Sequence, residues 1–205
     1  MKRLFAILTA LLLMLALAGC ERNPYEGAEN PIATITMEDG TVMRFELHLE
    51  AAPNTVANFT FLANKGFYDG LEFFRIVPGV LAQAGCPNND GTGGAGYTIK
   101  GEFAQNGVTN GLSHIRGVLS MARLGGNQYN SASSQFFIMA ANVPEYDGQY
   151  AAFGTALDDD TLAAISRLTN QRVDSYSVPM MRQKIATIRV NDHGMNLDPK
   201  IIVQE

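Results

Sequence analysis

The chain of 205 residues has no tryptophan, only two cysteines and three histidines, and a charged fraction of just 17%. Two cysteines cannot build the disulfide framework that holds a small secreted domain together. None of the three histidines has a second ligand residue at metal-binding spacing, so we expect no metal site. The 15 lysines and arginines are outnumbered by 20 acidic residues and form no long basic run. Because nucleic-acid binding requires clustered positive charge, this composition argues against a nucleic-acid partner.

The first twenty residues have the features of an export signal. Lys2 and Arg3 precede an uncharged, largely apolar run at residues 4–18, which is shorter than the roughly 20 residues that a membrane-spanning helix needs. The run ends in L-A-G-C, which resembles the bacterial lipobox, whose cysteine receives acyl chains such as palmitate and becomes the new N-terminus. We therefore predict a lipoprotein signal peptide at 1–19, lipidation of Cys20, and an exported protein anchored to the cell membrane. An ordinary signal peptide is the alternative.

The chain after this leader is predicted to be one acidic domain on a short tether. Residues 20–31 are polar, contain two prolines and a glycine, and predict a lipid-anchored tether without the long Ser/Gly linker that would indicate a second domain. Removing the first twenty residues, which carry Lys2 and Arg3 and no acid, moves the formal net charge from −5 to −7. Residues 32–205 form the predicted domain, and a monomer is expected because nothing indicates an oligomer.

The hydrophobic pattern predicts a mainly β fold. Residues 32–37 and 41–47 alternate around Asp39-Gly40, which is a hairpin signal. An apolar stripe with 3- and 4-residue spacing predicts a helix from Pro53 to Gly66. A second helix is predicted at 159–168, where acidic residues favour the N-terminal end. Further strands are predicted at 71–77, 80–84, 97–99, 118–122, 135–140, 152–156 and 185–190. This number of short strands, together with two helices, predicts a closed barrel whose ends are capped by the helices.

Two motifs of other enzyme classes are incomplete. Residues 91–96 match G-x-G-x-x-G, but a strand follows where a dinucleotide site needs a helix, and Arg116 stands where an acidic residue is required. We interpret these glycines as a loop beside a groove, where small residues let a peptide backbone approach. Ser120 or Ser134 could be paired with His114, but the G-x-S-x-G elbow of hydrolases is absent. His114 is therefore interpreted as a structural histidine.

Three ordered motifs resemble a single family. Residues 73–85 read F-F-R-I-V-P-G-V-L-A-Q-A-G and resemble F-H-R-V-I-P-G-F-M-x-Q-G-G. The others are G-V-L-S-M-A-R at 117–123 with N-S-A-S-S-Q-F-F-I at 130–138, D-G-Q-Y-A-A-F-G at 147–154, and G-T-G-G at 91–94. By these motifs the chain is similar to cyclophilin-type peptidyl-prolyl cis-trans isomerases from about residue 33 to 190. The resemblance implies a closed eight-stranded antiparallel barrel capped by two helices, and no cofactor.

The resemblance gives Arg75 the position of the catalytic arginine. A peptide bond resists rotation by about 18–20 kcal/mol, and X-Pro bonds exchange slowly although their cis and trans forms are nearly balanced. In the twisted transition state the nitrogen becomes basic, so a guanidinium that donates to it binds that state more strongly than the ground state. Arginine suits this role because it is always charged. The predicted function is therefore acceleration of X-Pro rotation in exported proteins, which would assist their folding.

The same resemblance implies a substrate groove. Adjacent strand residues point to opposite faces, so only one of Phe136 and Phe137 can face this groove, and we expect Phe136 in the core. By the resemblance, Val80, Leu81, Phe137 and Tyr146 line a cavity for proline, Gln83 and Gln135 hold the peptide backbone, Ala122 and Arg123 lie along the strand that pairs with the peptide, Gly91 edges the groove, and Tyr150 replaces a histidine of many eukaryotic members.

Some positions depart from the family pattern. Val80 and Leu81 replace an aromatic residue and a methionine, and Ala84 replaces a glycine. Glu145 stands where some members carry the tryptophan that binds cyclosporin, so we expect weak cyclosporin binding. Proline-containing polypeptides are the expected partners. A non-catalytic proline-peptide binding module or holdase chaperone is the alternative function, and the presence of Arg75 favours the enzyme.

Overall fold

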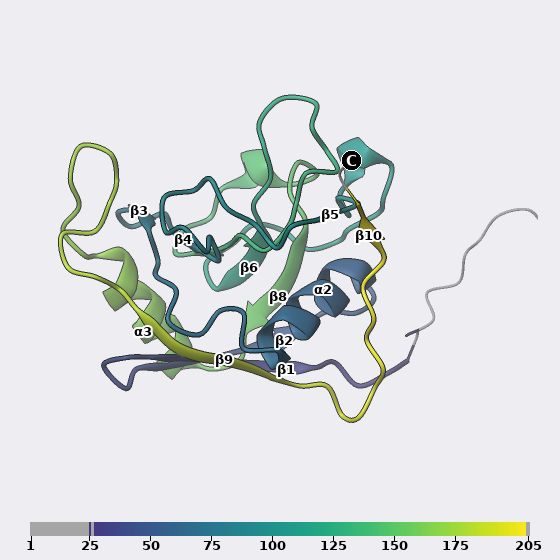
Figure 1. The fold of residues 1–205 in the computed structure, drawn as a ribbon, viewed down its shortest axis with the longest axis horizontal. Helices are drawn as coiled ribbons and strands as arrows, with labels where there is room; N and C mark the ends of the chain where they lie inside the picture. The colour runs from purple at the N-terminus through teal and green to yellow at the C-terminus, as the bar shows by residue number, and fades with distance from the viewer. Residues whose placement is uncertain (1–24, 26, 204–205) are drawn as a thin grey trace, which may run out of the picture.

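Eight antiparallel strands form one curled sheet in the computed structural model, which describes Tyr25 and residues 27–203 (Figure 1). Their order is β3-β4-β7-β6-β8-β2-β1-β9. The strands are β1 Ile32–Met37, β2 Val42–Leu47, β3 Arg75–Val77, β4 Leu81–Ala84, β6 Val118–Met121, β7 Phe136–Met139, β8 Ala152–Ala156 and β9 Ile185–Asn191. Two further strands, β5 Thr98–Ile99 and β10 Ile201–Ile202, pair with each other in a separate small sheet.

The sheet is an open half-barrel, so the expected closed barrel is wrong. Strands β3 and β9 are its two edges. They do not pair with each other, although the isolated bridge of Glu72 to Lys184 and backbone hydrogen bonds join residues 70–73, which precede β3, to residues 183–185 at the start of β9. β3 has three residues, and its free edge is occupied by a loop, since the Ile76 amide donates to the Ser177 carbonyl at 2.8 Å. Because the Ile76 amide is bonded to this loop, it is not available to β9.

Most predicted elements are present with small shifts in their ends. The hairpin of β1 and β2 has the expected alternation, with every second side chain buried on the inner face. The predicted strand at 71–77 is shorter, because only Arg75–Val77 forms a continuous ladder, with β4. The predicted strand at 97–99 forms as β5 but lies outside the main sheet. The second difference leaves eight of the nine predicted strands in the curled sheet.

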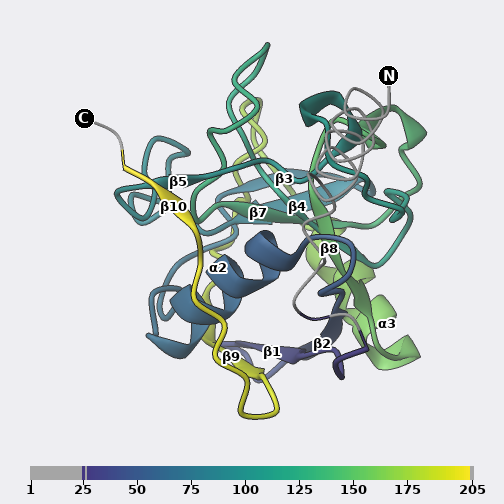
Figure 2. The same ribbon diagram turned by 90° about the vertical axis from the view of Figure 1, so that its right-hand side faces the viewer.

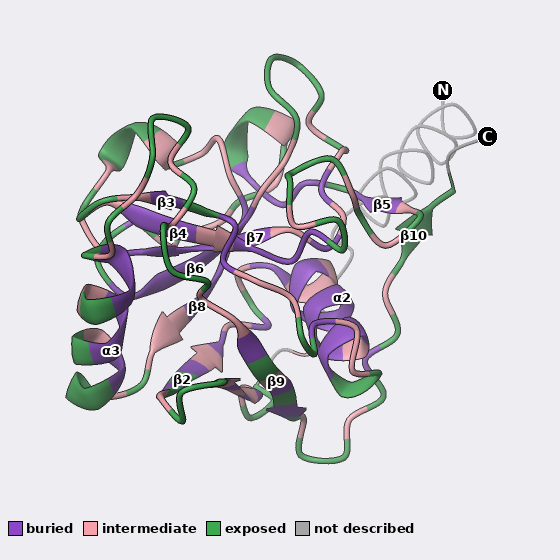
Figure 3. Cartoon of the chain, turned by 60° about the vertical axis from the view of Figure 1, so that its left-hand side comes forward, coloured by how far each residue is buried: buried purple, intermediate pink, exposed green. Residues whose placement is uncertain are grey.

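Two α-helices lie at opposite ends of this sheet (Figures 2 and 3). Helix α2 spans Pro53–Asn64 and packs against β9 and β5, whereas α3 spans Asp159–Thr169 and packs against β2. The Asp158 side chain caps α3 by accepting a hydrogen bond from the Thr161 amide, which satisfies one donor of the first turn. Both helices were predicted, and their bounds agree with the sequence pattern.

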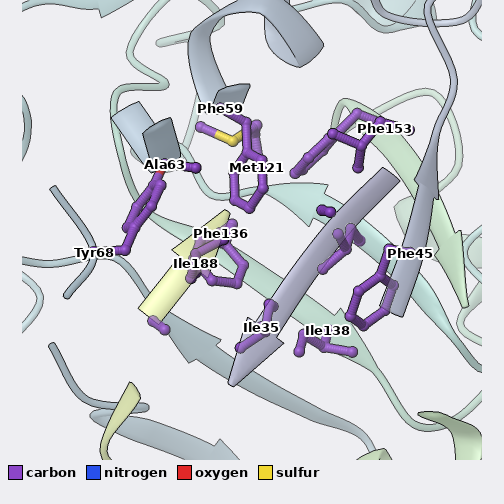
Figure 4. Packing of buried hydrophobic residues seen from close by; sticks show 14 of the residues in the cluster. Ile35, Phe45, Phe59, Ala63, Tyr68, Met121, Phe136, Ile138, Phe153 and Ile188 are labelled. Atoms are coloured by element: carbon purple, nitrogen blue, oxygen red, sulfur yellow. The ribbon is translucent and has the colours of Figure 1, made fainter. Parts of the chain in front are cut away.

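The main core fills the concave side of the sheet and is dominated by aromatic rings. Phe59 of α2 lies with its ring centroid 5.2 Å from that of Tyr68, 5.3 Å from Phe136 and 5.1 Å from Phe153 (Figure 4). All four side chains are fully buried. Aromatic pairs at these separations stabilise a core beyond the area that they bury, so α2 is fixed against the strands that also carry the candidate site.

The predicted leader and anchor lie largely outside the described residues. Cys20, the signal peptide at 1–19 and most of the tether are among the residues whose structure is not described. In the part that is described, no helix is both long and apolar enough to span a bilayer. The second cysteine, Cys86, is buried and reduced, with its sulfur accepting a hydrogen bond from the Gly93 amide.

The family pattern has glycine at both 84 and 85, but only position 85 requires glycine in this structure. The two positions should therefore differ sharply in what a change between glycine and alanine costs in stability. Ala84 is buried in β4, whereas Gly85 has a φ of 87° and its added Cβ would overlap the Ser134 carbonyl oxygen. We expect Gly85→Ala to lower the free energy of unfolding by more than about 1 kcal/mol, as measured by urea denaturation. The control Ala84→Gly should cost only about 0.5–1 kcal/mol. Equal losses in the two variants would contradict this explanation.

Candidate active site

The candidate site lies on the convex face of the sheet, opposite the main core. Along β4, Ala82 and Ala84 point into the core, while Leu81 and Gln83 point outward, as strand alternation requires. Phe136 belongs to the core and its neighbour Phe137 to the outer face, which confirms the expectation for this pair. The same strands therefore carry structural and candidate functional side chains on their two faces.

An apolar cluster forms one half of the site. Its buried members are Leu81, Val118, Phe137, Met139 and Ala152, and partly buried side chains pack around them. The structure brings together here all four predicted proline-cavity residues, Val80, Leu81, Phe137 and Tyr146, and also Tyr150. The ring centroid of Phe137 lies 6.0 Å from that of Tyr146 and 5.6 Å from that of Tyr150. The cluster is thus a small second core that is open to solvent at its edge.

A row of polar side chains forms the other half. Arg75 and Gln83 face each other across β3 and β4, and the Arg75 Nη1 donates to the Gln83 Oε1 at 3.2 Å. The Gln83 Nε2 donates to the Gln135 Oε1 at 3.0 Å. The Gln135 Nε2 in turn donates to the carbonyl oxygens of Gly91 and Gly93 at 2.9 and 2.8 Å. This row fixes the direction of the Arg75 guanidinium while leaving the side chain exposed to solvent.

A hollow of about 530 Å³ opens beside this row. Five predicted substrate residues line it: Gln83, Gly91, Ala122, Arg123 and Gln135. Ala122 also packs against the apolar cluster, so the hollow and the cluster adjoin. The structure therefore brings every predicted groove residue into one continuous surface, with Arg75 attached to it through Gln83. The sequence reasoning did not select Thr92, Tyr97 and Ser133, which also line the hollow; Thr92 and Ser133 lie within the quoted motifs, and Tyr97 lies outside them.

Arg123 uses its side chain within the protein. Its Nε donates to the Gln149 carbonyl at 2.9 Å, and its Nη1 donates to the carbonyls of Leu124 and Gly126 at 2.8 and 3.0 Å. The guanidinium also lies 5.0–5.4 Å from the ring centroids of Phe103, Tyr129 and Tyr150. These cation–π contacts and hydrogen bonds hold the loop after Arg123 against Tyr150. Contact with a peptide is therefore left to the backbone of Arg123.

Beneath the apolar cluster lies a buried hydrogen-bonded chain, of which sequence reasoning considered the pairing of His114 with Ser120 but not the link to Asp147. The His114 Nδ1 is 2.9 Å from the Asp147 Oδ1, and its Nε2 is 2.9 Å from the Ser120 Oγ. The His114 ring stacks on Phe137 with an interplanar angle of 23°. Burial lowers the pKa of His114 and outweighs the opposing effect of Asp147. The neutral ring therefore supports Phe137 from below.

This chain has the residue types of a hydrolase triad but not its accessibility. Ser120 and His114 are both buried, and a nucleophilic serine must reach its substrate. The interpretation of His114 as a structural histidine is therefore confirmed. Asp147 opens the D-G-Q-Y motif, yet it lies 33 positions from His114, so no local pattern indicated that the two side chains meet.

Comparison with known proteins identifies the family. The family model described as "Cyclophilin type peptidyl-prolyl cis-trans isomerase/CLD" matches residues 32–190. The chain is 51% identical to peptidyl-prolyl cis-trans isomerase B of Bacillus subtilis (strain 168) over 118 residues, covering 58% of this chain and 78% of that protein. It is 44% identical to the peptidyl-prolyl cis-trans isomerase of Synechococcus elongatus over 138 residues, covering 67% and 88%.

Solved structures agree with this result. A crystal structure of a Cryptosporidium parvum cyclophilin type peptidyl-prolyl cis-trans isomerase superimposes with a TM-score of 0.70 at 28% identity, covering 80% of this chain and 98% of that one. A second structure of that protein, in the presence of the dipeptide Ala-Pro, gives a TM-score of 0.68. The chain belongs to the cyclophilin-type peptidyl-prolyl cis-trans isomerase family.

The buried state of His114 predicts a pH-dependent stability. Because the folded-state pKa lies below the unfolded value of about 6.5, the unfolded chain binds the proton first as the pH falls. The contribution of His114 is therefore present above about pH 6.5 and is lost at lower pH. Urea denaturation between pH 8 and 5 should show this loss, with a slope of at most about 1.4 kcal/mol per pH unit for each histidine.

Two variants separate the histidines that contribute to this slope. His48 also has a pKa lowered by burial, so part of the slope belongs to it. His114→Gln and His48→Gln should each flatten the dependence, and the double variant should flatten it further. A slope that is unchanged in His114→Gln would show that this side chain is not held neutral in the folded protein.

Proposed function

We propose that the protein accelerates cis-trans rotation about X-Pro bonds in polypeptides. The observation that carries this proposal is the position of Arg75, which is fixed by Gln83 on the strand face that also carries the apolar cluster. Family membership and the similarity to a structure solved in the presence of Ala-Pro support it. A simple binding module would have no need for an oriented, exposed guanidinium beside its apolar site.

The two halves of the site have complementary tasks in this proposal. The proline ring lies on the apolar cluster, against Val80, Leu81, Phe137 and Tyr146, which excludes water from one side of the rotating bond. Gln83 and Gln135 hold the peptide backbone, and the strand end at Ala122 and Arg123 pairs with the extended chain, with Gly91 at the rim. Tyr150 closes the cluster beside Arg123. These contacts hold the chain on one side of the prolyl bond while the other side turns.

Arg75 supplies the part of the catalysis that depends on charge. As the bond twists, the prolyl nitrogen loses its conjugation with the carbonyl and gains a lone pair that can accept a hydrogen bond. A guanidinium donor aimed at this nitrogen stabilises the twisted state and leaves the planar states almost unaffected. A stabilisation of about 7 kcal/mol would correspond to a rate gain of about 10⁵. No proton is transferred, so the reaction needs no titrating residue.

We further propose that the protein works on exported polypeptides at a membrane surface. The support is the export signal at 1–19, the lipobox cysteine Cys20, and the short polar tether that follows it up to residue 31.

Glu145 in place of an aromatic residue supports weak cyclosporin binding, because the large apolar ligand would lose a ring contact there.

Removal of the Arg75 side chain should separate catalysis from binding. We expect Arg75→Ala to reduce kcat/KM for an Ala-Pro peptide by roughly 100-fold, which is about 2.7 kcal/mol of transition-state stabilisation, with little change in peptide affinity. Arg75→Lys should recover only part of the activity because an ammonium lacks the planar donor pair. The measurement is a protease-coupled or NMR exchange assay.

Arg44 provides the matched control. It is also an exposed strand arginine, but it lies on β2 and faces Asp158 at 3.9 Å, away from the groove. Arg44→Ala should leave kcat/KM unchanged within about twofold. Equal rates for wild type and Arg75→Ala, together with retained peptide binding, would favour the non-catalytic binding module or holdase instead.

The anchor is tested by mass spectrometry of the mature protein. Expression of the full chain in a bacterium should yield a protein that begins at Cys20 and carries a mass increase equal to two or three acyl chains, because a single chain gives only marginal membrane binding. Cys20→Ser should abolish this increase and release the protein from the membrane fraction. A mature protein that begins elsewhere and carries no lipid would show an ordinary signal peptide.

A further inference from the structure

Four large apolar side chains are exposed on one short loop between α3 and β9. Tyr176, Val178, Met180 and Met181 have exposed fractions of 84%, 46%, 65% and 71%. Solvation of isolated apolar side chains is common, but a cluster of them marks an interaction site. We name residues 172–181 the exposed hairpin, and Figure 1 shows this segment projecting past β3, at the opposite side of the molecule from α2.

The exposed hairpin is held in a defined conformation. The Met180 amide donates to the Arg172 carbonyl at 2.8 Å, and the Asp174 amide donates to the Val178 carbonyl at 2.9 Å. The Asp174 carboxylate accepts further hydrogen bonds from the amides of Tyr176 and Val178 at 2.8 and 2.9 Å. A preorganised loop loses little entropy when it binds. The apolar side chains are therefore presented on an ordered support.

The exposed hairpin lies directly beside the candidate active site. The Ser177 carbonyl accepts a hydrogen bond from the amide of Ile76, the residue directly after Arg75, at 2.8 Å. The Thr169 carbonyl, at the end of α3, accepts one from the Gly79 amide at 3.2 Å. Both contacts attach the segment to the β3 edge and to the turn that leads into Leu81. A polypeptide bound at Arg75 would therefore meet the exposed hairpin as it leaves the groove.

We propose that the exposed hairpin is a second binding surface for the unfolded polypeptide on which the enzyme acts. It would bind apolar side chains that flank the proline in sequence. Methionine suits such a surface because its flexible, polarisable side chain adapts to many partners. This inference rests on the proposed isomerase function and adds to it a preference for long, unfolded substrates over short peptides.

The position of the chain's entry into the domain favours a polypeptide over a membrane as the partner. Ile32, the first residue of β1, pairs with Asn191, whereas Met37 pairs with Ile185, the strand residue nearest to the exposed hairpin. The predicted tether therefore joins the sheet at one end of β9, and the exposed hairpin leads into the other end. A domain anchored through residues 20–31 presents the hairpin away from its point of attachment.

A pair of double variants tests this surface on the full chain. Met180→Ser/Met181→Ser changes the exposed hairpin, and Val42→Ser/Leu157→Ser changes two other exposed apolar residues away from the groove. Each double variant is assayed in two ways. The first is isomerisation of an Ala-Pro tetrapeptide, and the second is catalysis of the refolding of a disulfide-reduced protein whose refolding rate is limited by proline isomerisation. We expect unchanged tetrapeptide rates for both, within about twofold, and a loss of fivefold or more in refolding catalysis for the hairpin variant alone.

Binding measurements keep the inference distinct from the proposed catalysis. Affinity for a permanently unfolded polypeptide, measured by fluorescence anisotropy, should fall in the hairpin variant and persist in Arg75→Ala. A wild-type protein without tetrapeptide activity would refute the isomerase proposal. The anisotropy measurement would still show whether the exposed hairpin binds unfolded polypeptide. Equal refolding and affinity in the two double variants would overturn the inference. So would a hairpin variant that differs from wild type only in binding anionic lipid vesicles.

Discussion

The alternation of side chains along β4, β6 and β7 is the constraint on which the site depends. Ala82 and Phe136 fill the concave core, while their neighbours Gln83 and Phe137 build the convex surface. A strand that slipped by one residue would exchange the two faces and destroy both at once. The packing of Phe59 against Phe136 of β7 and Phe153 of β8 therefore stabilises the register that places Phe137 on the convex face.

The open edge of the sheet is the second organising feature. A strand that lies at an edge exposes unpaired backbone groups, which proteins protect by covering them. Here β3 is covered by the loop at Ser177 rather than by β9. This arrangement brings a segment from the end of α3 to the strand that carries Arg75. The departure from a closed barrel therefore also creates the surface beside the groove.

The sequence predicts the local features well and the long-range ones poorly. Periodicity located both helices and most strands, and the motifs selected residues that the structure brings together beside Arg75, because these signals come from neighbouring residues. Ser120 was considered as a partner of His114, but the complete chain with Asp147 was not predicted, since its members meet only after separate segments pack together. The role of the Arg123 side chain also depends on carbonyl groups of a loop whose path the sequence does not specify. The open edge of the sheet was missed for the same reason.

The polar row from Arg75 to the glycine loop has a direction. A guanidinium can only donate, so Gln83 must present its oxygen to Arg75 and its amide nitrogen to Gln135. Gln135 must then turn its own oxygen toward Gln83, which leaves its nitrogen for the carbonyls of Gly91 and Gly93. One positive charge thus sets the orientation of two amides and the loop beyond them. The four segments are therefore linked in one fixed order of donors and acceptors, because the guanidinium at one end can only donate and the carbonyl oxygens at the other end can only accept.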